Sequence, residues 1–146
     1  MSNLDFKTIS QQILVQAPDA ILYADRKGHI QMWNKGAERI FGFTADQVIG
    51  ESLDLIIPEK LQARHWEGYH KTMATGETRY GTELLAVPAM HRDGSRLSVE
   101  FSIVMLLDAG NKPEGIAAIM RDVTEHHRKE KELRQRLEKL ETAQNG

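Results

Sequence analysis

The stretch RYGTELLAVPAMHRDGSRLSVEFSIVMLL, residues 79–107, decides the fold. Two long strands, Arg79–Met90 and Arg96–Leu107, flank HRDGS, whose Asp93-Gly94 pair is a strong signal for a tight hairpin turn. Apolar and polar residues alternate along the second strand, which predicts one buried face and one solvated face. Pro88 cannot donate a hydrogen bond to a neighbouring strand, so the first strand is expected at a sheet edge or at a bulge.

Upstream of this hairpin, short strands alternate with short helices. The apolar runs Ala20–Ala24 and 30–33 flank a turn at 25–28 and predict a second hairpin. Lys35–Phe41 and Ala45–Ile49 predict two helices, each followed by a glycine. Helices this short are not stable alone, so we expect them to pack on the strands.

Downstream, Gly115–Val123 predicts a fifth strand, and the chain after it is almost wholly helix-forming. The expected fold is α+β: a five-stranded antiparallel sheet with helices packed on one face. We divide the chain into an N-terminal flanking helix at 1–16, a globular domain at 17–125 and a C-terminal helix at 126–146. Leucines in that last helix follow the spacing of a short coiled coil, although a solvated helix packed on the body is the alternative: Leu133, Leu137 and Leu140.

The stretch LIIPEKLQARHWEGYHKTMATG, residues 55–76, predicts a helix that begins near Pro58 and ends at Gly76. At ~100° per residue, His65 falls in the same apolar arc as Tyr69 and Met73. Gly68 and Thr72, which flank Leu61, are small side chains beside the histidine, where a flat ligand could approach. His65 and His70 are spaced i, i+5, which disfavours a two-histidine zinc site.

The composition is that of an ordinary globular protein and narrows the possible functions. A net charge of −2 without a dense basic patch gives no sign of nucleic-acid binding. No apolar run is long enough to span a membrane and no secretory signal is evident, so the cytoplasm is the expected compartment. The chain has no cysteine. No catalytic triad, phosphate loop or carboxylate cluster is present, so we do not expect an enzyme.

The order of these elements resembles the PAS sensory domains. The resemblance covers about Ala17–Glu125 and is carried by PDAILYADRKGHIQMWNKGAERIFGFTADQVIGESLDLIIP, by HRDGS and by RDVTE. It implies a ligand or cofactor pocket between sheet and helices and a homodimer formed through the flanking helices. It also implies output to a downstream effector, such as a histidine kinase of a two-component system, a cyclase or a chemotaxis module. Three residues of RDVTE are expected to anchor the signalling helix: Arg121, Asp122 and Thr124.

Within this family, LIIPEKLQARHWEGYH is similar to the segment of haem-binding PAS domains from oxygen-sensor kinases and phosphodiesterases. The resemblance implies that His65 ligates the iron of haem b. The family's distal arginine falls on Leu85, so a donor that would stabilise bound oxygen is missing here. The remaining pocket residues that we predict come from the helix and the two long strands: Gly68, Tyr69, Thr72, Val87, Val99, Phe101 and Ile103.

The sequence leaves two functions open. The first is a haem-based gas or redox sensor. The second is a haem-free PAS module that senses another small molecule or serves dimerisation and signal relay. For His65 the alternative to ligation is a hydrogen bond to a backbone carbonyl, and for the strand residues it is an ordinary filled core.

Overall fold

The computed structural model describes residues 4–77 and 85–145. The elements, in chain order, are α1 (Phe6–Gln16), β1 (Ala20–Asp25), β2 (Ile30–Trp33), α2 (Lys35–Phe41), α3 (Ala45–Val48), the 3-10 helix η1 (Leu53–Ile56), α4 (Glu59–Thr75), β3 (Leu85–Met90), β4 (Arg96–Leu107), β5 (Pro113–Asp122) and α5 (Thr124–Asn145). The bounds of α2, α3, α4 and β4 lie within one residue of those that the sequence predicts. The part of the predicted first long strand at 79–84 lies outside the described residues.

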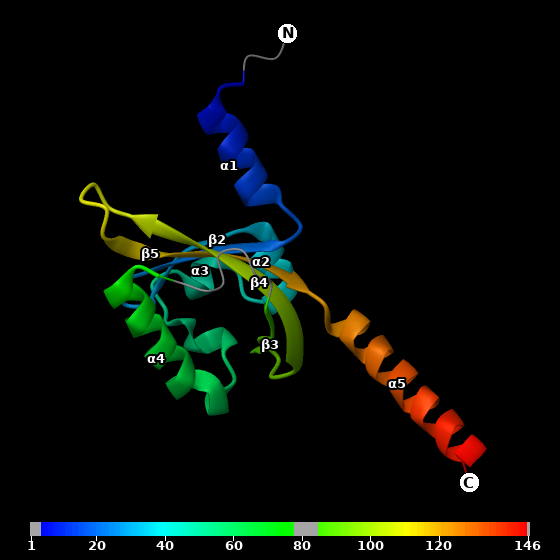
Figure 1. The fold of residues 1–146 in the computed structure, drawn as a ribbon. Coiled ribbons are helices and arrows are strands. Elements are labelled where there is room, and N and C mark those ends of the chain that lie inside the picture. Colours follow the sequence, from blue (N-terminus) through cyan, green and yellow to red (C-terminus); the bar gives the residue numbers. More distant parts are fainter. Residues whose placement is uncertain (1–3, 78–84, 146) are drawn as a thin grey trace.

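The five strands form one antiparallel sheet in the order β2-β1-β5-β4-β3. Because β3 is an edge strand, Pro88 lies where a missing donor is tolerated, as predicted. Helices α2, α3 and α4 lie on one face of the sheet, whereas α1 and α5 project away from the body (Figure 1). The predicted α+β architecture is confirmed.

The hydrophobic core lies between the sheet and the short helices. Alternate residues of β1 are buried, because successive side chains of a strand point to opposite faces. Leu22 from β1 and Ile30 from β2 are buried together with Phe41 at the end of α2. Each such side chain contributes about 1.5–3 kcal/mol through burial. This packing is what holds helices that are too short to be stable alone.

Glycines end two of the helices in the way the sequence predicts. Gly42 follows α2 with φ 83° and Gly76 follows α4 with φ 73°, both in the left-handed region that favours glycine. At the start of α2, the Asn34 side chain accepts a hydrogen bond from the Ala37 amide at 2.9 Å. These caps fix the length of the helices that cover the sheet.

Candidate functional site

Helix α4 places His65 toward the interior. The side chains of Tyr69 and Met73 on this helix are buried, and His65, one turn before Tyr69, is half-buried. This agrees with the apolar arc that the helical spacing predicts. His70, five residues further along the helix, is exposed.

The His65 imidazole lies beside two aromatic rings. Its centroid is 4.7 Å from that of Trp66 and 5.7 Å from that of Tyr69. The Nδ1 atom of His65 is buried and has no hydrogen-bond partner in the part of the chain that the structure describes. Burial lowers the pKa of His65, and the nearby Asp54 carboxylate opposes this effect only in part. The ring is therefore neutral at neutral pH, which is the form that can ligate a metal.

The neighbours of His65 are held in place by hydrogen bonds to other elements. The Tyr69 hydroxyl donates to the carbonyls of Ala24 and Asp25 at the end of β1, and burial raises the pKa of this phenol. The Trp66 indole Nε1 donates to Asp54 Oδ1 of η1 at 2.7 Å. Asp54 is not among the predicted site residues, and no short motif indicates it, because the contact joins two separate elements. These bonds join α4 to η1 and to the end of β1.

Gly28, in the turn between β1 and β2, gives Trp66 the space it occupies. A Cβ atom on Gly28 would lie 2.1 Å from the Trp66 ring, and the backbone φ is +83°. We expect Gly28→Ala to lower the free energy of unfolding by about 3 kcal/mol, because φ strain is added to displacement of a hydrogen-bonded indole. Urea denaturation followed by tryptophan fluorescence measures this effect.

Gly94 supplies the matched control for this prediction. Its φ is +88°, yet a Cβ atom there would meet nothing within 4 Å. Gly94→Ala should therefore show only the backbone strain, about 1–2 kcal/mol. If Gly28→Ala and Gly94→Ala lowered the free energy of unfolding equally, the packing of Trp66 on Gly28 would not contribute to stability.

The inner face of the sheet carries the other predicted pocket residues. Val99 is buried, while Val87, Phe101 and Ile103 are half-buried. Leu85 pairs with Phe101 across β3 and β4. On α4, Thr72 is half-buried and Gly68 is exposed, and a Cβ added at Gly68 would meet nothing within 4 Å. The structure thus brings the strand residues onto one inner face, with Gly68 on the solvent side of the helix.

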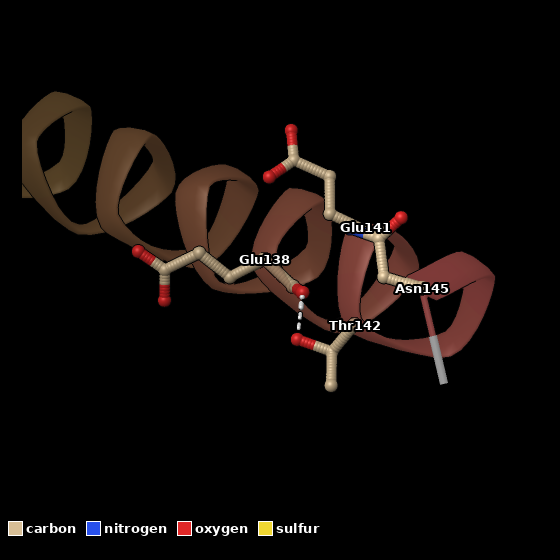
Figure 2. Close-up of a pocket in the computed structure, with 4 residues that line it drawn as sticks. All are labelled: Glu138, Glu141, Thr142 and Asn145. Carbon is tan, nitrogen blue, oxygen red and sulfur yellow. Dashed lines mark hydrogen bonds between the residues drawn. The ribbon is translucent and has the colours of Figure 1, made fainter.

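Two shallow hollows lie along the last turns of α5. Figure 2 shows one of them, lined by Glu138, Glu141, Thr142 and Asn145, where the Thr142 hydroxyl donates to the Glu138 carbonyl at 2.8 Å. These residues lie on an exposed helix surface, so the hollow has no enclosing walls. Within 4–77 and 85–145, no group of three or more His, Asp or Glu side chains could hold a metal ion.

The predicted signalling residues lie where β5 passes into α5. The Thr124 hydroxyl accepts a hydrogen bond from the Ser98 amide of β4 at 3.0 Å, and the Thr124 amide donates to Asp122 Oδ1 at 2.9 Å. Arg121 forms an ion pair with Asp19 at 3.4 Å, just before β1. The start of α5 is therefore joined to the sheet through β4.

The sheet order and the placement of the helices agree with a match to a family model. The model described as "PAS fold" matches residues 14–128. This chain belongs to the PAS family. Among the described residues, no helix of this PAS domain combines the length and the apolar character needed to cross a membrane.

Known relatives and structures of the PAS domain agree with this assignment. The sensor protein FixL of Bradyrhizobium diazoefficiens is 28% identical over 129 residues, which cover 88% of this chain and 25% of that protein. The oxygen sensor protein DosP of Escherichia coli is 26% identical over 74 residues, covering 51% of this chain and 9% of DosP. The crystal structure of a PAS domain from Colwellia psychrerythraea has a TM-score of 0.73 at 22% identity, covering 83% of this chain and 99% of that one. The chain spans a quarter or less of the length of the curated relatives it matches.

Proposed function

We propose that this PAS domain is a haem-based gas or redox sensor in which His65 ligates the iron. The observation that carries the proposal is the buried Nδ1 of His65, which lacks a hydrogen-bond partner among the described residues. An unsatisfied buried polar atom costs about 1–3 kcal/mol of folding free energy. A metal ligated by the imidazole would offset this cost. When bound, haem iron supplies a site for a diatomic gas or for a change of redox state. The similarity to DosP, named an oxygen sensor, supports the same reading.

The residues proposed to hold the haem come from α4 and from the inner face of the sheet. The neutral imidazole of His65 would ligate iron, and Val99, Phe101 and Ile103 would provide an apolar wall. Tyr69, Thr72 and Val87 complete the proposed set, whereas Gly68, also predicted from the sequence, lies on the solvent side of α4 and is left out of it. Leu85 offers no hydrogen-bond donor, so we expect CO or NO to bind better than oxygen.

A second candidate, the haem-free PAS module, is favoured by the packing around His65. Trp66 and Tyr69 lie against the His65 ring, so aromatic side chains occupy part of the space beside it. In this case the domain would sense another small molecule or relay a signal between flanking helices. The neutral imidazole of His65 supports haem ligation, and its contacts with Trp66 and Tyr69 support the second candidate.

The signal is proposed to leave through α5 toward an effector outside this domain. Thr124 joins the start of α5 to Ser98 of β4, the strand that carries Val99, Phe101 and Ile103 of the proposed pocket wall, and Asp122 accepts from the Thr124 amide. The α5 leucines, Leu133, Leu137 and Leu140, are all exposed, as expected of a helix that pairs with a second helix. A homodimer through the flanking helices and a downstream effector such as a histidine kinase are therefore part of the proposal.

Haem uptake tests the proposal directly. The purified chain, supplied with haem, is expected to develop a Soret band in its visible spectrum, and His65→Ala is expected to lose it. His70→Ala is the matched control, because His70 is exposed on the same helix and should leave the band unchanged. Circular dichroism checks that each variant is folded. A folded wild-type protein that stays colourless would rule out haem and leave the second candidate.

A further inference from the structure

Helix α5 carries its leucines on one line, and polar residues begin that line. Leu133, Leu137 and Leu140 follow one another at steps of four and three residues, the spacing of a coiled-coil seam. The same steps, continued toward the start of the helix, give Glu130 and then His126. In a pair of parallel α5 helices, the leucines therefore form three layers of the seam, and His126 and Glu130 form the two layers before them.

His126 and Glu130 already point at each other along this line. The Nε2 atom of His126 lies 3.1 Å from Glu130 Oε1, and both side chains are exposed. Two ligands that each lie about 2.0–2.1 Å from a tetrahedral Zn²⁺ ion are about 3.3 Å apart. The pair therefore needs only a small movement to chelate one ion from one side.

A second copy of α5 supplies the other half of a four-ligand site. In a parallel pair the two-fold axis runs along the seam, so each His126 faces the partner's His126 and each Glu130 faces the partner's Glu130. Helical side chains lean toward the N-terminus, which brings the Glu130 carboxylates toward the His126 layer. Two imidazoles and two carboxylates match the ligand number and the donor types that Zn²⁺ takes in proteins.

The charges beside the seam favour a parallel second copy as the partner of α5. Arg136 and Glu141 lie at flanking positions of successive heptads, where each faces the opposite charge on the partner helix. One heptad earlier, the flanking residues Lys129 and Arg134 carry like charges, and the seam beside them has no leucine. The first heptad therefore pairs weakly without a ligand, whereas the later one pairs through leucines and an ion pair.

We propose that two copies of α5 bind one Zn²⁺ ion through His126 and Glu130 of each copy, and that this ion closes the first heptad of the coiled coil. The Thr124 hydroxyl, two residues before His126, accepts from the Ser98 amide of β4 at 3.0 Å. The ion would thus lie next to the joint between the sheet and the signalling helix. The inference rests on the proposed pairing of α5 and not on haem, so zinc uptake and haem uptake can fail separately.

Zinc binding and sedimentation of the whole chain test the site. We expect one Zn²⁺ per two chains and a dimer at least tenfold tighter in zinc than in EDTA, and we expect His126→Ala to lose both. His127→Ala is the matched control, because His127 is an exposed imidazole beside the seam rather than in it, and it should keep both. A wild-type chain that pairs without taking up zinc would overturn the inference and leave the pairing of α5 in place. A chain that stays monomeric with zinc would overturn both.

Glu130→Gln separates ligation of the ion from packing of the helices. The substitution keeps the size of the side chain but removes the anionic ligand and the repulsion between two facing carboxylates. We expect this variant to pair in EDTA at least as tightly as the wild type and to gain nothing from zinc. Co²⁺ used as the probe should give the visible absorption of a tetrahedral site in the wild type and not in the variant. A Glu130→Gln dimer that zinc still tightens tenfold would overturn the inference.

A disulfide tests the parallel direction that the site requires. The chain has no cysteine, so Gln144→Cys introduces a single thiol at the far end of the same seam. Parallel helices place the two thiols together, and oxidation should join the two chains. Antiparallel helices would place residue 144 beside residue 126 of the partner, with the two thiols roughly 27 Å apart. A zinc-dependent dimer in which Gln144→Cys fails to cross-link would overturn the four-ligand site.

Discussion

Gly36→Ala is expected to lower the free energy of unfolding by about 4 kcal/mol, although alanine is the better helix former. Gly36 lies in α2 against the segment that joins α1 to β1. A Cβ atom there would lie 2.0 Å from the carbonyl oxygen of Asp19 and 2.7 Å from that of Ala17. Both atoms belong to the backbone and cannot rotate away, so either α2 or the start of β1 must move. Urea denaturation monitored by circular dichroism measures the loss.

Gly68→Ala is the matched control, because Gly68 also lies within a helix. Nothing lies within 4 Å of a Cβ built there, so the higher helix propensity of alanine acts alone. We expect a gain of roughly 0.5–1 kcal/mol. The two substitutions are chemically identical and should have opposite signs. A Gly36→Ala variant as stable as the wild type would show that the joint between α1 and β1 is free to shift.

The elements of this fold could be predicted where one local signal dominates. The helix Lys35–Phe41 was predicted with a glycine after it, and the structure confirms its bounds and shows that Asn34 caps its start. Strand β4 was predicted with its observed bounds, because alternation and the Asp93-Gly94 turn agree. The fifth strand, predicted at Gly115–Val123, begins two residues earlier, at Pro113, because pairing with Leu107 extends the ladder beyond the apolar run.

The sequence could predict which residues of the candidate site share one face of a helix or strand, but not which elements pack against that face. Helical spacing alone places His65 on the side of α4 that bears Tyr69 and Met73. What surrounds His65 depends on contacts between elements distant in sequence, such as the bond from Trp66 to Asp54 and the fit of Trp66 over Gly28. Gly28 was recognised as a turn residue, but a turn glycine carries no signal for the ring that packs on it. The haem role of His65 stays a prediction.

The contacts of Asn34 could not be predicted from the sequence either, because its position there indicates only the end of a strand and the start of a helix. In the structure its side chain is buried in the core, and its amide joins three segments. Oδ1 accepts from the amides of Ile21 and Ala37, while Nδ2 donates to carbonyls on either side of the end of α1, including that of Leu14. The partners lie between 3 and 20 residues away.

Asn34→Asp is therefore expected to lower the free energy of unfolding at pH 7 by about 3–5 kcal/mol, the cost of an uncompensated buried charge. The new oxygen replaces Nδ2 and faces the Leu14 and Asp19 carbonyls, so burial and repulsion raise the pKa of this carboxyl in the folded protein. The folded variant then binds a proton that the unfolded chain releases above about pH 4, and the loss grows as the pH rises from there. Denaturation at pH 4 and pH 7 measures the difference.

Asn111→Asp makes the same chemical change at an exposed position, in the turn between β4 and β5. It should alter stability by no more than about 0.5 kcal/mol at either pH. A loss for Asn34→Asp that is equally large at pH 4 and pH 7 would mean that shape, rather than charge, sets the requirement at this position. A loss that shrinks at pH 4 would mean that the hydrogen-bond donors of Asn34 hold α1 to the body of the domain, because a protonated acid restores one of them.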